Sequence, residues 1–210
     1  MVLFVLAIFF VWLAGRELFN PGERRSGFSW GYIFVLMSLA VTCALPQYKI
    51  WRLESFLSKK AAIIAERPEA DVKCNSIVGS IIDGRGTDYV AGTAYIGTGE
   101  IVFENGFCKL FMKYMDDPEN ASMKEVYAMQ VYVHEVMHIR GERNEQKTEC
   151  QAIQRHHYVS EILGVDRSIA RRDALRYYKR TYPNHSYRTA ECKPGGKMDE
   201  RLPYSVWDKE

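Results

Sequence analysis

His134, Glu135 and His138 are the residues whose types and spacing can do chemistry in this chain. In the run His-Glu-Val-Met-His the two histidines are four residues apart, so on an α-helix they share a face and can hold one metal ion. The carboxylate of Glu135 lies beside them, where it can take a proton from a metal-activated water molecule. The spacing therefore predicts a hydrolytic site with His134 and His138 as ligands and Glu135 as general base.

The sequence around this motif predicts two helices joined by a tight turn. A Ser-x-x-Glu pattern that begins at Ser122 is typical of a helix start, and apolar residues recur at helical spacing over residues 123–140. Gly141 can adopt the left-handed conformation that ends a helix, and Asn144 is a good N-cap for a second helix over residues 145–163. We therefore expect the motif near the end of one helix, directly before another.

The third metal ligand should come from that second helix, because a catalytic zinc ion takes three protein ligands and keeps one position for water. Two antiparallel helices that meet near residues 142–143 place residue 149 level with the histidines, so we expect Glu149 to be this ligand. Glu145 would then support a ligand histidine through a hydrogen bond. The reverse assignment, with Glu145 as ligand and Glu149 as support, stays open.

The stretch from His134 to Cys150 resembles the core of gluzincin-type zinc metallopeptidases, with a short segment between the ligands. It is most similar to a group of poorly characterised bacterial, membrane-anchored H-E-x-x-H proteins. These have a glycine three residues after the second histidine and end in a C-x-P-G-G-x-x-D segment, as Cys192 to Asp199 does here. The resemblance covers residues 74–208. Asn144 stands where a metzincin has its third histidine, which argues against that class.

The resemblance implies a zincin-like metallopeptidase domain in the α+β class, mainly helical, with Zn²⁺ as cofactor and a protein or peptide as substrate. The expected reaction is peptide-bond hydrolysis by a metal-activated water, with Glu135 as general base. The alternative is a non-catalytic, membrane-tethered sensor or binding domain with a structural zinc. A closed site, in which Glu145 and Glu149 both bind the metal, would indicate that alternative.

Segments rich in β-forming residues precede the motif, namely residues 76–82, 89–96 and 100–103. Glycine-rich turns separate them, so we expect a small antiparallel sheet. Residues 93–103 are the candidate for an edge strand that pairs with an extended substrate backbone. Further helices are expected over residues 105–115 and 166–181.

The first sixty residues differ from the rest. Met1–Gly15 carries no charged side chain, and Ser26–Tyr48 is a second uncharged stretch of 23 residues. A helix of that length spans about 35 Å, enough for a bilayer core of about 30 Å. We expect a membrane anchor over residues 1–46 that forms a hairpin of two transmembrane helices, with a single span as the alternative. It is followed by a juxtamembrane helix over 47–68, which continues from the membrane, and by a zinc metallopeptidase-like domain over 69–210.

Charge and cysteine content limit the partners and the location. The net charge of +2 gives no electrostatic reason to expect a nucleic acid. Basic residues flank the second apolar stretch on both sides and do not decide its orientation. Outside that stretch, Cys74, Cys108, Cys150 and Cys192 have no C-x-x-C spacing and suit two disulfides in an oxidising compartment, with three pairings open. We therefore expect a protein of the cell membrane with its soluble domain on the exocytoplasmic side.

The group that would stabilise an oxyanion opposite the zinc is not determined by the sequence. Tyr158, Tyr178 and Tyr187 are the candidates. His156 and His157 lie two turns beyond Glu149, and we place both outside the predicted site because surface or core histidines are commoner than ligands.

Overall fold

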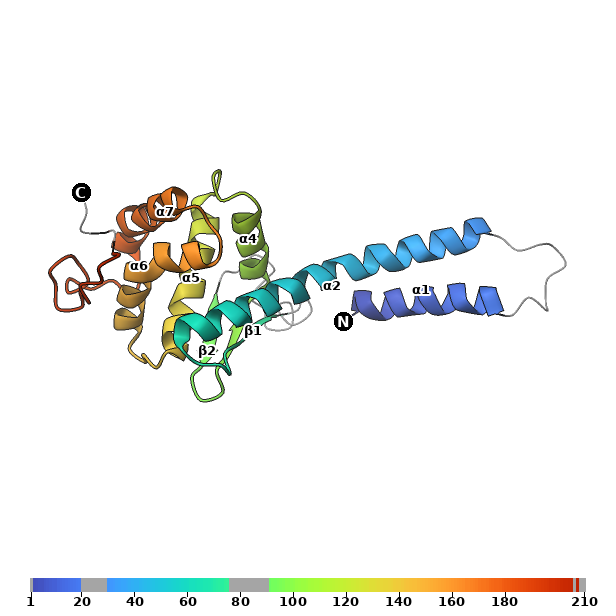
Figure 1. Cartoon of the computed structure of the whole chain (residues 1–210), viewed down its shortest axis with the longest axis horizontal. Coiled ribbons are helices and arrows are strands. Elements are labelled where there is room, and N and C mark those ends of the chain that lie inside the picture. The colour runs from blue at the N-terminus through green and yellow to red at the C-terminus, as the bar shows by residue number, and fades with distance from the viewer. Residues whose placement is uncertain (1, 20–29, 76–90, 206, 208–210) are drawn as a thin grey trace. The chain divides into compact units, whose positions relative to one another are not determined.

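Two compact units make up the chain. The computed structural model describes residues 2–19, 30–75, 91–205 and 207 (Figure 1). The two units are Met1–Leu53 and Glu54–Glu210.

The first unit consists of α1 (Val2–Phe19) and the larger part of α2 (Trp30–Ala65). Ala14, Ile33 and Leu36 are buried where these helices meet, whereas most other large apolar side chains on both helices are exposed. Such an apolar surface is unfavourable in water and is typical of a helix that faces lipid. By length and composition, α2 is the one helix in the described part of the chain that could cross a membrane.

Helix α2 does not stop at the end of its apolar stretch. The sequence predicted that the juxtamembrane helix over residues 47–68 continues from the membrane segment, and residues 30–65 form one continuous helix that contains Pro46. Its last turns belong to the second unit, where Leu57 and Ala61 are fully buried. The hydroxyl of Tyr132 donates a hydrogen bond to the Leu57 carbonyl at 3.0 Å, which ties this end of α2 to the centre of the domain.

A small mixed sheet covers one side of the second unit. Its strands are β1 (Asp71–Cys74), β2 (Gly92–Tyr95) and β3 (Glu100–Phe103), in the order β1-β3-β2. The pair β2–β3 is antiparallel as expected, but β1 pairs parallel to β3, so the prediction of an antiparallel sheet was wrong in this respect. Strand β1 was not expected because only Val72 in it is buried and no alternating pattern develops. The predicted strand over residues 76–82 lies outside the described residues.

Four helices follow the sheet and build the domain core. They are α4 (Asn105–Asp116), α5 (Met123–Ile139), α6 (Glu145–Ile162) and α7 (Arg167–Arg180), which confirms the predicted helices to within two residues at each end. Helix α5 is central, since it packs against α4, α6, α7 and β2. Aromatic rings fill the space between the sheet, α4 and α5: Phe103, Phe107, Phe111 and Tyr132 are fully buried and contact one another.

After a short 3₁₀ helix at Tyr182–Asn184, the described residues form an irregular C-terminal segment. The prediction of two disulfides is confirmed: Cys74–Cys108 joins β1 to α4, and Cys150–Cys192 joins α6 to this C-terminal segment. The remaining cysteine, Cys43, lies in α2 and is free.

Candidate metal centre

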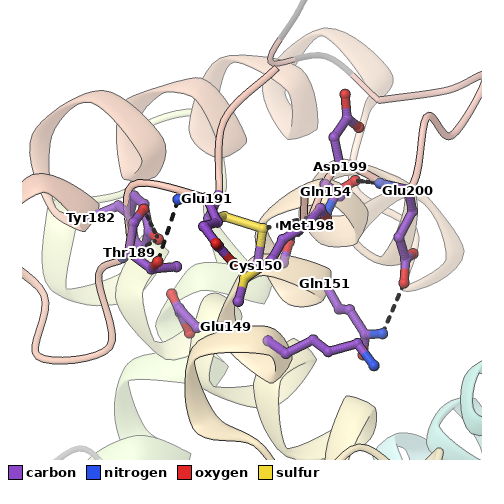
Figure 2. The surroundings of a disulfide bond; sticks show 12 residues. Glu149, Cys150, Gln151, Gln154, Tyr182, Thr189, Glu191, Met198, Asp199 and Glu200 are labelled. Carbon is purple, nitrogen blue, oxygen red and sulfur yellow. Dashed lines mark hydrogen bonds between the residues drawn. A yellow bond between two sulfur atoms is a disulfide. The ribbon is translucent and has the colours of Figure 1, made fainter. Parts of the chain in front are cut away.

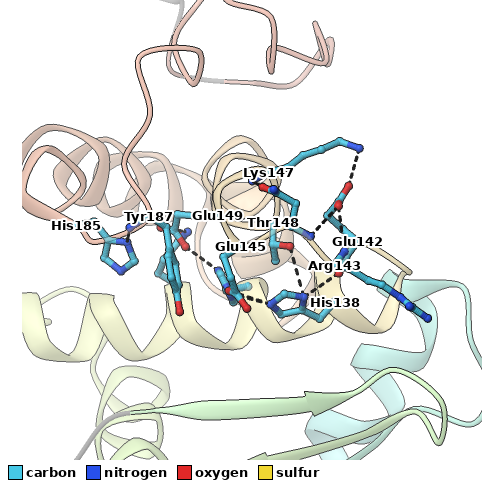
Figure 3. A network of polar contacts seen from close by, with 12 residues as sticks. His138, Glu142, Arg143, Glu145, Lys147, Thr148, Glu149, His185 and Tyr187 are labelled. Carbon is cyan, nitrogen blue, oxygen red and sulfur yellow. Dashed lines mark hydrogen bonds and ion pairs between the residues drawn. The ribbon is translucent and has the colours of Figure 1, made fainter.

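A tight turn brings the start of α6 beside the end of α5. Gly141 follows α5 with φ of 117°, a value that side chains disfavour. The Glu142 carboxylate accepts hydrogen bonds from the backbone N–H groups of Arg143 and Asn144, both at 3.0 Å. The side chain of Asn144 then caps α6 by accepting from the Lys147 N–H at 2.9 Å. As a result, Glu145, the first residue of α6, lies directly next to the motif (Figure 3).

Three donor atoms converge at this junction. His134 Nε2 lies 3.1 Å from His138 Nε2, and Glu145 Oε2 lies 3.1 Å from the first and 3.3 Å from the second. Ligands about 2.0–2.1 Å from a tetrahedral zinc ion are about 3.3 Å apart, so these spacings fit one small cation. In the described part of the chain this is the group of histidine, cysteine and acidic side chains that could hold a metal ion.

The other nitrogen of each ring faces an acceptor. His134 Nδ1 is 2.8 Å from the Glu149 carboxylate, and His138 Nδ1 is 2.8 Å from the Glu142 carbonyl oxygen. In a neutral ring these contacts require the proton on Nδ1, so both Nε2 atoms present lone pairs. Two lone pairs and a carboxylate oxygen that point at one another repel unless a cation or a proton lies between them. The donor set therefore fits a divalent metal ion.

Glu149 occupies the position that supports a ligand. It is 2% exposed and bonds to the Nδ1 side of His134, away from the point where the three donors meet. Its second oxygen accepts hydrogen bonds from the Tyr177 hydroxyl at 2.6 Å and from Gln130 Nε2 at 3.1 Å. Of the two candidate acids, Glu145 is thus the one that faces both Nε2 atoms, and Glu149 holds His134 in orientation.

His134 and Glu149 each shift the pKa of the other. Burial alone would lower the pKa of His134, but the hydrogen bond to Glu149 and the neighbouring carboxylates outweigh burial and raise it. Burial acts to raise the pKa of Glu149, but its hydrogen bonds to His134 and Tyr177 outweigh that effect and lower it. The pair therefore favours a charged carboxylate beside an imidazole that binds protons readily.

Glu135 points from α5 toward strand β2. Its side chain is 7% exposed, and burial raises its pKa, with His134 and His138 opposing this in part. The strand comes close because residue 92 is glycine: a Cβ atom there would stand 2.7 Å from Glu135 Cγ and 2.6 Å from Phe103 Cε1. Gly92 thus allows the sheet edge to lie against the carboxylate that the sequence predicts as general base.

A cavity of about 580 Å³ lies over these residues. Its walls come from α5, the start of α6, the β2 strand and the C-terminal segment, which contributes His185 and Tyr187. The Tyr187 ring stacks on the His134 ring, with centroids 5.6 Å apart and planes 17° apart. Tyr158 and Tyr178 do not line this cavity, so of the three tyrosines considered from the sequence only Tyr187 is near the donors.

His156 and His157, which we placed outside the predicted site, do not line the cavity. His156 is fully buried, its pKa is lowered to about 4 by burial, and its Nδ1 lies 2.7 Å from Gln130 Oε1. Sequence reasoning missed Gln130, which connects His156 to Glu149. A usable signal existed: Gln130 precedes His134 by four residues, so both occupy the same face of α5.

Comparison of the chain with protein-family models, with curated proteins and with solved structures finds no match.

Proposed function

We propose that this protein is a membrane-anchored, zinc-dependent metallopeptidase of the gluzincin type, with a zincin-like domain. The observation that carries the proposal is the convergence of His134 Nε2, His138 Nε2 and one Glu145 oxygen within 3.3 Å of one another. Two imidazoles and a carboxylate are the ligand set of many catalytic zinc sites, which keep a fourth position for water. Bound there, Zn²⁺ would activate a water molecule and polarise the amide carbonyl of the substrate.

Glu135 is the general base of the proposed reaction. Its burial raises its pKa, and a carboxylate of raised pKa accepts a proton more readily from water and returns it to the leaving amine. Tyr187 is the candidate for stabilising the oxyanion, because its ring lies against His134 and its side chain lines the cavity. Glu149 keeps the His134 ring in the orientation that directs Nε2 at the metal.

In the described part of the chain β2 is an outer strand of the sheet, and its edge next to Glu135 suits an extended peptide. The Glu104 N–H donates to the Ala91 carbonyl, and Gly92 and Ala94 pair with Phe103 and Ile101 across the antiparallel ladder. Because bonded and non-bonded pairs alternate in such a ladder, the backbone groups of Gly92 and Ala94 point away from β3. The Ala94 N–H donates to the Glu135 carboxylate, which leaves the Ala94 carbonyl and the Gly92 backbone groups for a substrate. A substrate backbone added here would lie along the cavity and bring its scissile amide to Glu135.

The alternative, a structural zinc in a non-catalytic sensor or binding domain, requires a closed set of four ligands. The position of Glu149 argues against it, since this acid bonds to His134 Nδ1 and to Tyr177 rather than facing the three donors.

The membrane part of the proposal places the catalytic domain on the exocytoplasmic side of the cell membrane. Its support is the apolar character of α2 together with the two disulfides, which persist in oxidising compartments.

Substitution of Glu135 by glutamine tests the proposed reaction. The full chain in detergent, loaded with Zn²⁺, should hydrolyse unfolded protein or a mixed peptide library. Glu135→Gln should bind the same amount of zinc and lose hydrolysis by at least about a thousandfold, since the side chain can no longer accept the proton. Hydrolysis that persists in a zinc-loaded Glu135→Gln sample would exclude the mechanism.

A further inference from the structure

One face of α6 holds the C-terminal segment through a dense set of contacts (Figure 2). The Cys150–Cys192 disulfide is the covalent part. One turn along, Gln154 Nε2 donates to the Met198 carbonyl at 3.0 Å, and Gln154 Oε1 accepts from the Glu200 N–H at 2.9 Å. Residues 192–200 are therefore fixed to the helix that also carries Glu145 and Glu149.

The part of the C-terminal segment that lines the cavity is restrained by a hydrogen bond between Thr189 and Tyr182 and by the disulfide at Cys192. The Thr189 N–H donates to the Tyr182 hydroxyl at 3.1 Å, which closes a loop over residues 182–189. Tyr187 lies inside this loop and only five residues before Cys192, so its backbone has little freedom while both restraints hold. Its ring stacks on His134, and His185 contacts its edge with centroids 5.2 Å apart.

We infer that the Cys150–Cys192 disulfide and Gln154 are positioning residues that hold Tyr187 against His134. The catalytic consequence rests on the proposed function, whereas the placement of Tyr187 does not. The three metal donors belong to α5 and α6, and none belongs to the C-terminal segment. Loss of the restraint therefore removes Tyr187, which also hydrogen-bonds Glu145, from the site, whereas the two helices that carry the donors stay packed against each other.

Burial of the disulfide indicates a permanent restraint. Cys150 is 0% and Cys192 is 3% exposed, so an external thiol reaches the bond only when the segment opens. The second disulfide, Cys74–Cys108, supplies a matched control. It closes a loop of similar length, with a sequence separation of 34 against 42, so its loss should destabilise the domain similarly. It joins β1 to α4 and includes no residue of α6 or of the C-terminal segment.

Nuclear magnetic resonance of the histidine rings tests the placement without metal or activity. The full chain contains five histidines, so selective labelling gives a simple spectrum in detergent micelles. The ring current of Tyr187 should displace the His134 resonances, and Tyr187→Leu should remove this displacement. The double variant Cys150→Ala/Cys192→Ala should produce the same shift as Tyr187→Leu, and Cys74→Ala/Cys108→Ala should not. Gln154→Met keeps the disulfide and should produce part of the same change in the His134 resonances. This variant tests the inference if Cys150→Ala/Cys192→Ala does not fold.

Kinetics of zinc-loaded protein test the catalytic consequence. If the wild type hydrolyses peptides, removal of Cys150–Cys192 should lower kcat by about the same factor as Tyr187→Phe, with zinc content unchanged. The two changes combined should cost little more than either alone, because both remove the Tyr187 hydroxyl from the site. An unchanged His134 spectrum in the Cys150→Ala/Cys192→Ala variant overturns the inference. Absence of hydrolysis by the wild type overturns the proposed function instead, and the spectra still decide the placement.

Discussion

His134 Nδ1 and Glu149 Oε2 lie 2.8 Å apart in the interior of the domain, on the side of the imidazole away from the other metal donors. This contact fixes which nitrogen of His134 carries the proton and leaves Nε2 to face His138 and Glu145. Glu145 and Glu149 of α6 thus contact different nitrogen atoms of the same ring, although only one helical turn separates them.

This difference predicts unequal effects of neutralising the two acids. Glu145→Gln removes a proposed ligand and should weaken zinc binding by more than about a hundredfold. Glu149→Gln leaves the three donors in place and should weaken it by about 10–100-fold, the range for supporting carboxylates. Titration of the full chain against a chelator of known affinity measures both. A larger loss for Glu149→Gln than for Glu145→Gln would reverse the assignment of ligand and support.

Zinc affinity should fall as the pH is lowered, and the fall should begin at a pH above the usual pKa of a histidine side chain. The pKa of His134 is raised, and the protonated ring has no lone pair on Nε2, so protons compete with the metal. Below that pKa the affinity should drop by about tenfold per pH unit for one competing proton. In Glu149→Gln the carboxylate that raises the pKa is gone, so the fall should start at lower pH. Calorimetric titrations at several pH values check this, and an unchanged profile in Glu149→Gln would contradict it.

Gly92 should be essential for the position of Glu135. A Cβ atom at residue 92 would overlap Glu135 Cγ and the Phe103 ring, so Gly92→Ala must displace the base. A displacement of about 1 Å costs about a hundredfold in rate, and we expect this loss in kcat with normal zinc content. Gly97→Ala is the matched control, since a Cβ there meets nothing within 4 Å and Gly97 has no positive φ. Equal activity of the two variants would show that the strand does not constrain Glu135.

The membrane assignment predicts that the domain is exported. A reporter enzyme that is active only where disulfides form, fused after residue 210, should be active in cells, and the chain should sediment with membranes. An inactive reporter that is made in normal amounts would place the domain in the cytoplasm, where disulfides are rare.

The sequence predicted the helices of the domain well because their signals are local. Ser122 and Glu125 form the expected capping box, and Asn144 and Asp166 cap α6 and α7. Strand β1 and its parallel pairing were not predicted, because four residues with one buried side chain carry no periodic signal. Pairing between segments distant in the chain has no such local signature.

Spacing alone could not decide which of Glu145 and Glu149 faces both histidine Nε2 atoms and which bonds to His134 Nδ1. It depends on how closely α6 follows α5, and this in turn depends on the Glu142 side chain, which folds back over the N–H groups of Arg143 and Asn144. The prediction of Glu149 as ligand treated the two helices as symmetric about residues 142–143. It did not include the hydrogen bonds of the Glu142 side chain that tighten this turn. Tyr187 was only one of three candidates, because its approach to His134 is set by a disulfide whose pairing the sequence left open.

Zinc stoichiometry of the purified full chain tests the central claim most directly, with X-ray absorption at the zinc edge to identify the ligands. We predict one zinc ion per chain in the wild type and in Glu135→Gln, bound by two nitrogen atoms from imidazoles and by oxygen atoms that include a water. We predict no stoichiometric zinc in the His134→Ala/His138→Ala variant. Failure of the wild type to bind zinc, or one zinc ion that persists without the two imidazoles, would contradict the account.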